Sequence, residues 1–193
     1  MQEDDEVTNN YSIKKFRIDE VYKTSDELDF SLIGSVYHKI MEHINFELKT
    51  LEEIKSQIQK LIDNNILPIN TFELVDAQKI LLATLKIAEL MSGASEVKRE
   101  QQFMMFVPYN EVFKNSDVTD KILIQGVIDL IIIKKEEARI VDFKTTRMNE
   151  PADLVKKYAT QLELYKKAYE KASEKVVFKK LIYSFHLNNI VNV

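Results

Sequence analysis

Two aspartates stand at positions where apolar residues are the rule. Asp129 lies in the run Ile122–Ile133 and Asp142 in the run Arg139–Thr146, and the neighbours of both are mostly Val, Ile, Leu and Phe. A carboxylate buried alone among such side chains is costly, so each needs a hydrogen-bond donor, a proton or a cation. These two residues are therefore the first candidates for chemistry.

The two runs are separated only by the charged segment Lys134–Ala138, which predicts a β-hairpin. A loop centred between Lys135 and Glu136 places Asp129 opposite Asp142, with their Cβ atoms about 4.5–5.5 Å apart. At this spacing like charges repel each other, and one oxygen-ligated cation can be shared.

Lys144 follows Asp142 by two positions, so a strand puts both side chains on the same face. Two acids and one base suit phosphodiester hydrolysis. A cation polarises the phosphate and lowers the pKa of a bound water, while the lysine orients that water or stabilises the developing charge. An Asp-x-Lys tripeptide alone is usually a surface pair, but a surface pair does not need Asp129 in a second apolar strand.

Five segments in this order make the chain resemble the PD-(D/E)XK nuclease superfamily, and within it the RecB-like nuclease domain of AddA-type helicase-nuclease subunits. The segments are 34–38 (Gly-Ser-Val-Tyr-His), 99–100 (Arg-Glu), 125–129 (Gln-Gly-Val-Ile-Asp), 141–145 (Val-Asp-Phe-Lys-Thr) and 161–165 (Gln-Leu-Glu-Leu-Tyr). The family often has an acid after the lysine-threonine pair, where this chain has Thr146 and Arg147. The resemblance implies a restriction-endonuclease-like core, in which helices flank a mixed β-sheet.

The resemblance also implies a catalytic metal, held by His38, Asp129, Asp142 and the backbone carbonyl of Phe143, with Lys144 as the catalytic lysine. The expected metal is Mg²⁺. The imidazole of His38 would suit Mn²⁺ better, since nitrogen ligands favour the later divalent metals. Without the resemblance, His38 is more simply explained as a histidine at the edge of the core.

Three further residues gain a role only through the resemblance. Gln161 and Tyr165 match the motif on the helix after the hairpin, and one helical turn separates them, so both would reach the same side of the site. On physical grounds alone they are an ordinary helix pair. Glu100 matches an acidic position of the first core strand and would support the metal or a second cation, or it simply pairs with a lysine.

The implied substrate is DNA, degraded by an exonuclease during double-strand-break repair by recombination. The implied partners are a helicase portion of the same polypeptide and a second, AddB-like subunit. The chain has no Walker-type phosphate loop, so we expect the motor in a missing N-terminal portion. AddB and the CRISPR adaptation exonucleases carry a four-cysteine iron-sulfur cluster, which a chain without cysteine cannot build.

Two other functions stay open at this point. One is a catalytically inactive DNA-docking or subunit-interaction module of the same fold. The other is a stand-alone restriction-like endonuclease, which would cut circular DNA without a motor.

Hydrophobic periodicity predicts one α+β domain whose first half is helical. Helices are expected over 31–48, from Leu51 until Asn64-Asn65, and from Asn70 until Gly93, the last opening with a capping box formed by Asn70 and Glu73. Alternation predicts a strand over 97–104, in which Val97, Arg99, Gln101 and Phe103 share a face.

After the hairpin, the pattern predicts a long helix over 153–172 and a strand over 176–185. Residues 190–193 are either a last edge strand or the start of a continuation of the chain. Residues 1–28 are polar and acidic and are expected to form a tail or docking segment, which leaves 29–193 as the nuclease domain.

Composition narrows the setting of the protein. The 193 residues include no cysteine, which excludes disulfides and thiolate metal sites and favours a reducing compartment, here the cytoplasm. The acidic start lacks the features of a signal peptide, and the run Ile122–Ile133 is shorter than the roughly 20 residues of a membrane helix, so no membrane partner is expected. Residues 147–180 hold 9 basic and 5 acidic residues, which form either a face for a DNA backbone or a solvated helix surface.

Overall fold

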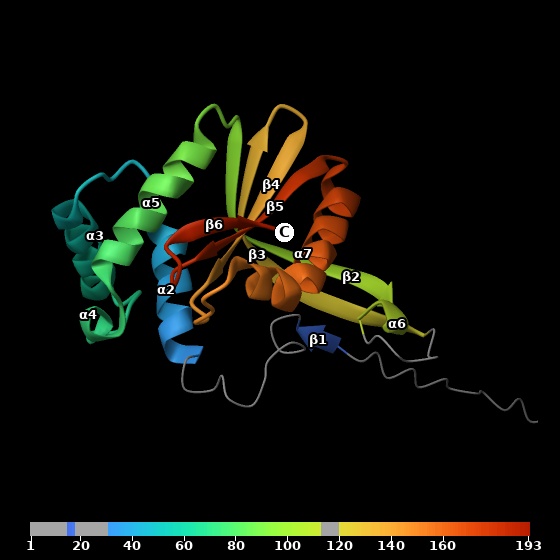
Figure 1. Cartoon of the computed structure of the whole chain (residues 1–193), viewed down its shortest axis with the longest axis horizontal. Coiled ribbons are helices and arrows are strands. Elements are labelled where there is room, and N and C mark those ends of the chain that lie inside the picture. The colour runs from blue at the N-terminus through green and yellow to red at the C-terminus, as the bar shows by residue number, and fades with distance from the viewer. Residues whose placement is uncertain (1–14, 18–30, 113–119) are drawn as a thin grey trace, which may run out of the picture.

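A six-stranded mixed β-sheet forms the centre of the protein in a computed structural model, which describes residues 15–17, 31–112 and 120–193 (Figure 1). The strands run in the order β1-β3-β4-β5-β6, and β2 pairs with the other edge of β3. Their bounds are β1 Lys15–Arg17, β2 Glu96–Pro108, β3 Lys121–Lys134, β4 Glu137–Lys144, β5 Val176–Ser184 and β6 Asn189–Asn192. The predicted α+β class with a mixed sheet between helices is confirmed.

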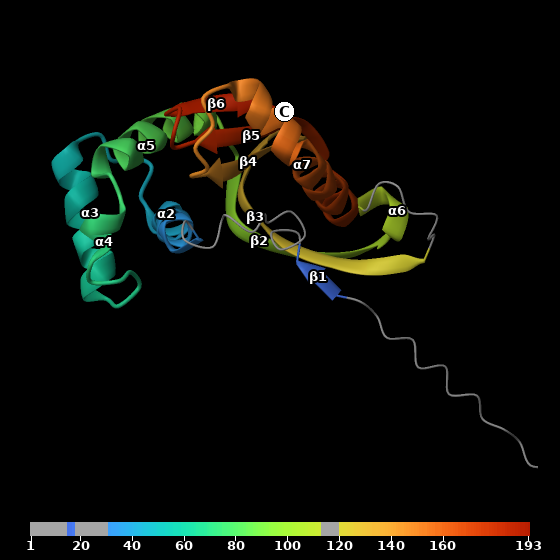
Figure 2. The same ribbon diagram turned by 60° about the horizontal axis from the view of Figure 1, so that its bottom comes forward.

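Helices cover both faces of the sheet (Figure 2). On one face lie α2 (Ser31–His43), α3 (Leu51–Asp63), α4 (Thr71–Leu74) and α5 (Ala77–Met91), and on the other lies α7 (Pro151–Ser173). The first core joins Ile40, Ile54 and Ile87 to Leu130 of the sheet, and the second joins Leu164 of α7 to Ile131. The sheet is thus the layer that fixes where both helical layers lie.

The helices of the first half differ from the predicted ranges at their ends. The helix predicted over 31–48 ends at His43. The helix predicted from Asn70 until Gly93 is two helices, because Val75 is extended and the side chain of Asp76 caps α5 by accepting the N–H of Gln78. The capping box predicted at Asn70 is wrong, since this side chain makes no capping hydrogen bond.

The capping box of the protein lies at the start of α3. The hydroxyl of Thr50 accepts the N–H of Glu53, and the carboxylate of Glu53 accepts the N–H of Thr50 in return. Both residues fit the Thr-x-x-Glu pattern that favours a helix start.

The predicted register of the hairpin is confirmed. Leu130 pairs with Val141, and Lys134 pairs with Glu137 across a loop of Lys135 and Glu136. Lys135 has a φ of 56°. A left-handed residue lets so short a loop reverse the chain even without the Gly or Asn that such loops favour.

The strand predicted over 97–104 changes faces in its middle, contrary to expectation. Val97 packs against the core beneath α2 and α5, whereas Phe103 packs against the core beneath α7. Between them Glu100 has a φ of 50°, and it interrupts the ladder with β3 between the pairs Arg99–Leu130 and Gln101–Ile128. The left-handed backbone at Glu100 reverses which face of the sheet the following side chains occupy. Val97 and Phe103 therefore lie on opposite faces, not on the common face that was predicted.

Two short elements were not predicted. Lys15–Arg17 pairs in parallel with 123–125 of β3, which corrects the expectation of a tail without secondary structure at these three residues; the rest of 1–28 lies outside the described residues. Tyr109–Val112 forms the short helix α6. Residues 189–192 pair with β5 at the end of the strand order, which makes β6 an edge strand of the described sheet. No described helix is long and apolar enough to cross a membrane.

Candidate active site

Asp129 lies where the ladder of β3 with β2 is interrupted and just before the ladder with β4 begins. The pairing of β3 with β4 begins one residue later, and the pairing with β2 skips the position opposite Glu100. The opening is filled by the carboxylate of Asp129, whose Oδ2 accepts the backbone N–H of Phe143 at 2.7 Å. A side chain thus replaces the ladder bond that the backbone would make, and this holds the carboxylate in one orientation.

His38 approaches the same carboxylate from α2. Its Nδ1 lies 3.3 Å from Oδ1 of Asp129, and its side chain is one-third exposed. Burial alone would lower the pKa of His38, but the charge of Asp129 and the hydrogen bond to it outweigh burial and raise the pKa. For Asp129, burial raises the pKa, yet His38, Lys144 and the Phe143 N–H together hold the pKa below its ordinary value.

The position of α2 over the sheet depends on two residues besides His38. Nη1 of Arg99 donates to the carbonyl oxygens of Glu42 and Ile44 at 2.8 and 2.7 Å, so a side chain of β2 caps the C-terminal end of α2. At the other end, a Cβ on Gly34 would lie 3.3 Å from Oγ1 of Thr145. A side chain at this position would require Thr145 to shift by a few tenths of an ångström, so α2 passes close to the end of β4.

Asp142 and Lys144 form the second charged pair. Nζ of Lys144 lies 2.8 Å from Oδ2 of Asp142 and 4.6 Å from the ring centroid of Tyr158. Burial lowers the pKa of Lys144, but Asp142 and Asp129 outweigh it and raise the pKa, so the amine keeps its proton at neutral pH. The predicted common face of Asp142 and Lys144 is confirmed by their contact.

Asp142 is poorly compensated for its burial. It is 1% exposed, and burial raises its pKa more than Lys144 lowers it, with Asp129 raising it further. Nζ of Lys144 is the partner of Oδ2 of Asp142, and this ion pair offsets the burial of the carboxylate only in part. A buried carboxylate that is compensated only in part is suited to a cation.

The chemistry of the candidate metal ligands suits a divalent ion. Asp129 and Asp142 supply hard oxygen ligands, and His38 supplies an imidazole nitrogen, which together suit Mg²⁺ or Mn²⁺. In the described residues no three His, Asp or Glu side chains are already arranged as a metal-binding group. Here His38 pairs with Asp129 and Lys144 pairs with Asp142, so a bound ion would replace parts of these contacts.

Glu100 faces Asp129 across the interrupted ladder. Its pKa is raised to about 7, first by burial and then by the charges of Asp129 and Glu42. Within the described residues it forms no ion pair, so the structure offers no support for the alternative that it pairs with a lysine. A strained backbone next to a carboxylate cluster is typical of a functional site.

Gln161 and Tyr165 lie on α7 and contact each other. Nε2 of Gln161 donates to the hydroxyl of Tyr165 at 2.7 Å, and both residues are buried. The ring of Tyr165 packs edge-on against Phe103 with centroids 5.5 Å apart, and Phe103 lies over Gly126 so closely that a Cβ there would meet its ring at 2.8 Å. The motif is therefore positioned by β2 and β3.

Sequence reasoning missed the roles of Arg99 and Tyr158. Arg99 belongs to one of the five motif segments, but its link to α2 is a contact between distant segments that no periodicity reveals. Tyr158 supports Lys144 with its ring and hydrogen-bonds to the hydroxyl of Thr146 at 2.7 Å. Its place on the apolar face of α7 is visible in the sequence, and its closeness to Lys144 is not.

Comparison with known families and proteins places the chain in a family. The family described as the PD-(D/E)XK nuclease superfamily matches residues 13–189. The chain is 26% identical over 166 residues to an ATP-dependent helicase/nuclease subunit of Clostridium botulinum (strain 657 / Type Ba4), a match that covers 83% of the chain and 13% of the relative. Proteins of the same name from Carboxydothermus hydrogenoformans and Syntrophomonas wolfei are 32% and 28% identical.

The Carboxydothermus match covers 86% of this chain and 15% of the relative, and the Syntrophomonas match covers 83% and 13%. The chain therefore spans less than a sixth of the length of these relatives.

Proposed function

The chain belongs to the PD-(D/E)XK nuclease superfamily, and from this premise we propose that it is a divalent-metal-dependent DNA exonuclease domain of an AddA-type helicase-nuclease. Nucleases of this superfamily generally use divalent metals. The proposal concerns the metal dependence, the DNA substrate and the reaction of this chain.

One observation carries the proposal. Asp142 and Asp129 are two buried carboxylates at one site, with His38 beside them, and the pKa of Asp142 stays raised even though Nζ of Lys144 lies 2.8 Å from its Oδ2. A divalent cation would supply the positive charge that this burial calls for.

The proposed ligands of the ion are Asp129, Asp142, His38 and the carbonyl of Phe143, and Glu100 supports the first ion or a second one. When bound, a divalent ion polarises the phosphate and lowers the pKa of the attacking water. Mg²⁺ is the expected ion, and Mn²⁺ is expected to substitute for it.

The side chains of the chain have separate tasks around that ion. The proton of Lys144 is held on Nζ by Asp142, so the amine acts as a fixed positive charge that stabilises the developing charge on the phosphate, not as a general base. The ring of Tyr158 keeps this amine in place. The buried, hydrogen-bonded pair of Gln161 and Tyr165 supports the site from the α7 side.

In the complete protein we propose that a helicase portion of the same polypeptide delivers the strand and that an AddB-like protein completes a heterodimer. The relatives are named helicase/nuclease subunits and are much longer than this chain. The site would then trim one strand during double-strand-break repair by recombination, in the cytoplasm.

The experiment is a cleavage assay on linear and closed circular DNA with Mg²⁺, Mn²⁺ or EDTA. We expect linear DNA to be degraded with either ion, circular DNA to stay intact, and EDTA to stop the reaction. Asp142→Ala should abolish cleavage, whereas Asp63→Asn, which changes an exposed acid at the end of α3, should not. An unchanged rate in Asp142→Ala contradicts the metal-dependent mechanism, and cleavage of the circle favours a restriction-like endonuclease.

A second candidate is an inactive docking module of the same fold. It is favoured by the lack of a ready three-residue metal group among the described residues. Calorimetric titration with Mn²⁺ separates the two candidates. An active site should bind the ion with an affinity that Asp129→Asn removes, and a docking module should show no such difference.

A further inference from the structure

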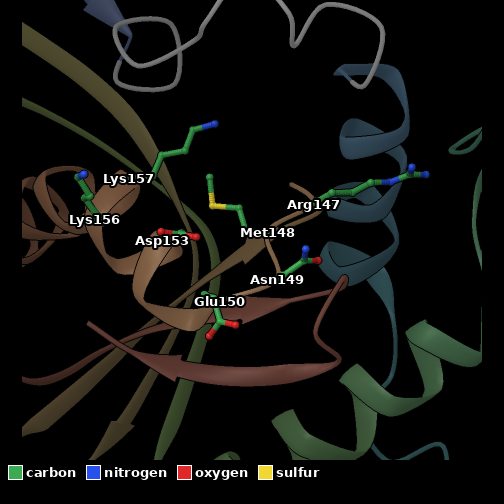
Figure 3. A pocket seen from close by; sticks show the side chains of 7 residues that line it. All are labelled: Arg147, Met148, Asn149, Glu150, Asp153, Lys156 and Lys157. Carbon is green, nitrogen blue, oxygen red and sulfur yellow. The ribbon is translucent and has the colours of Figure 1, made fainter.

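An open hollow lies between the end of β4 and the first turns of α7 (Figure 3). Its volume is roughly 790 Å³, which is within the usual range of ligand sites. Its cationic lining comes from Arg147, Lys156 and Lys157, and its acidic lining comes from Glu150 and Asp153. Figure 3 shows the side chain of Met148 near the middle of the hollow, between the lysines and Arg147.

The hollow adjoins the candidate active site through Tyr158. Nζ of Lys144 lies 4.6 Å from the ring centroid of Tyr158, and Nζ of Lys157 lies 5.4 Å from the same centroid. Lys144 of the site and Lys157 of the hollow therefore both contact the ring of Tyr158. The ring of Tyr158 thus connects the candidate active site to the hollow.

The hollow contains acids as well as cations, and the dipole of α7 explains the acids. Glu150 is the N-cap residue of α7 and Asp153 lies in its first turn, where acids interact favourably with the helix dipole. Glu150 makes no capping hydrogen bond with its side chain, so its position is not fixed by a structural task. Three cations against two acids leave a net charge of +1, which attracts an anionic chain only weakly.

We propose that this hollow holds the sugar-phosphate backbone of the substrate strand next to the scissile phosphate. The identity of the ligand as a DNA strand rests on the proposed nuclease function. Lys156 and Lys157 neutralise phosphates, and Arg147 does so from the opposite side. Contacts of this kind carry no base sequence, so binding depends on salt and not on sequence.

Glu150 and Asp153 limit the affinity of the hollow for the DNA strand. A strand that a motor feeds through the site has to leave each position as easily as it enters, and Glu150 and Asp153 limit the affinity that the three cations would otherwise give. The signs of the side chains therefore predict opposite effects. Removing a lysine weakens DNA binding, and neutralising Glu150 strengthens it.

The test measures the dissociation constant of the full 193-residue chain for a fluorescent single-stranded oligodeoxynucleotide in EDTA at several salt concentrations. Lys156→Gln with Lys157→Gln should raise this constant about tenfold at low salt and reduce the salt slope by about 1.4, since each single-strand phosphate contact contributes about 0.7. Glu150→Gln should lower the constant. The matched control is Lys55→Gln with Lys60→Gln, which removes the same charge from exposed positions of α3 and should leave binding unchanged.

Equal affinities of the two double variants would overturn the proposal, because binding would then follow net charge alone. A Glu150→Gln affinity no higher than that of the unaltered chain would also overturn it, since the strand would then pass elsewhere. The same variants are assayed for cleavage with Mn²⁺, where the hollow variant should raise KM and keep kcat. If the unaltered chain cleaves nothing, the proposed function fails, while the binding assay in EDTA still decides on the hollow.

Discussion

Two regions of the molecule bury different kinds of side chain. The first is the helical part, formed by α3, α4 and α5. The second is the junction, where Asp129 and Asp142 lie between β2, β3 and β4. Ile54, Ile58, Ile80 and Ile87 of the helical part are 0% exposed, and the start of α3 is closed by the Thr50–Glu53 capping box. The junction instead contains Asp129 and Asp142, which are the only charged side chains buried in the described part of the chain.

The comparison shows that the junction is less favourable for stability than the helical part. In the helical part, apolar residues are buried and the polar ends of α3 and α5 are hydrogen-bonded, so each local feature favours the same fold. At the junction, Glu100 is left-handed, the ladder of β2 with β3 skips Asp129, and the burial of Asp142 keeps its pKa raised despite the contact with Lys144. Such costs accumulate where a protein performs chemistry.

The largest expected effect tests the junction directly. Asp129→Asn keeps an oxygen that can accept the N–H of Phe143 but removes the charge, so we expect cleavage to fall at least about a thousandfold, or about 4 kcal/mol. The melting temperature should stay within a few degrees. A variant that cleaves normally would contradict the separation of activity from stability at this residue.

The second prediction concerns the helical part. Ile54→Ala removes a fully buried side chain from the core and should lower the free energy of unfolding by about 2–5 kcal/mol. Below its melting temperature the variant should cleave DNA with an unchanged kcat, because the site lies in another part of the molecule. Urea unfolding and initial rates at low temperature check the two halves of this statement.

The third prediction joins stability and activity. Gly126→Ala would place a Cβ 2.8 Å from Cζ of Phe103 and 3.6 Å from Cε1 of Tyr165, so we expect a loss of about 1–3 kcal/mol in stability and a lower kcat as the Gln161–Tyr165 pair moves. Adding Phe103→Leu should restore part of the stability by relieving the clash. If the melting temperature of Gly126→Ala is unchanged, the close packing has no such role.

The smallest expected effect comes from the capping box. Thr50→Ala should cost about 1 kcal/mol near neutral pH. Hydrogen bonds from the N–H of Lys49 and from Thr50 lower the pKa of Glu53 below its ordinary 4.5. Because the folded state binds this proton less readily than the unfolded state, the contribution of Glu53 is present above that value and is lost as the pH falls through the folded pKa.

Thermal melts between pH 3 and 7 check this last statement. The difference between Thr50→Ala and the unaltered chain should shrink in acid, and Glu53→Gln should flatten the acid limb of the curve. A difference that does not change with pH would contradict the reciprocal bonds.

Prediction from sequence succeeded where the interactions are local. The hairpin register followed from a loop between Lys135 and Glu136, and the contact between Asp142 and Lys144 followed from strand alternation. The register mattered because it brings Asp129 and Asp142, which are thirteen positions apart in the chain, to one site.

The errors have a common physical origin in contacts between distant segments. The first helix was predicted to reach Leu48, but it ends at His43, where Arg99 of β2 donates to its last carbonyl groups. The face switch at Glu100 comes from a backbone conformation that no residue type announces, since glutamate is rarely left-handed. The metal-ligand roles of His38 and Phe143 stay predictions.

Arg99 also ties the helical part to the junction. One guanidinium holds the end of α2 to the strand that carries Glu100, and it stacks on the ring of Phe46, 4.2 Å away. On α2 itself, the hydroxyl of Tyr37, the neighbour of His38, accepts the N–H of Asp76 at the start of α5. A displacement of α5 would therefore be passed through α2 to the imidazole of His38.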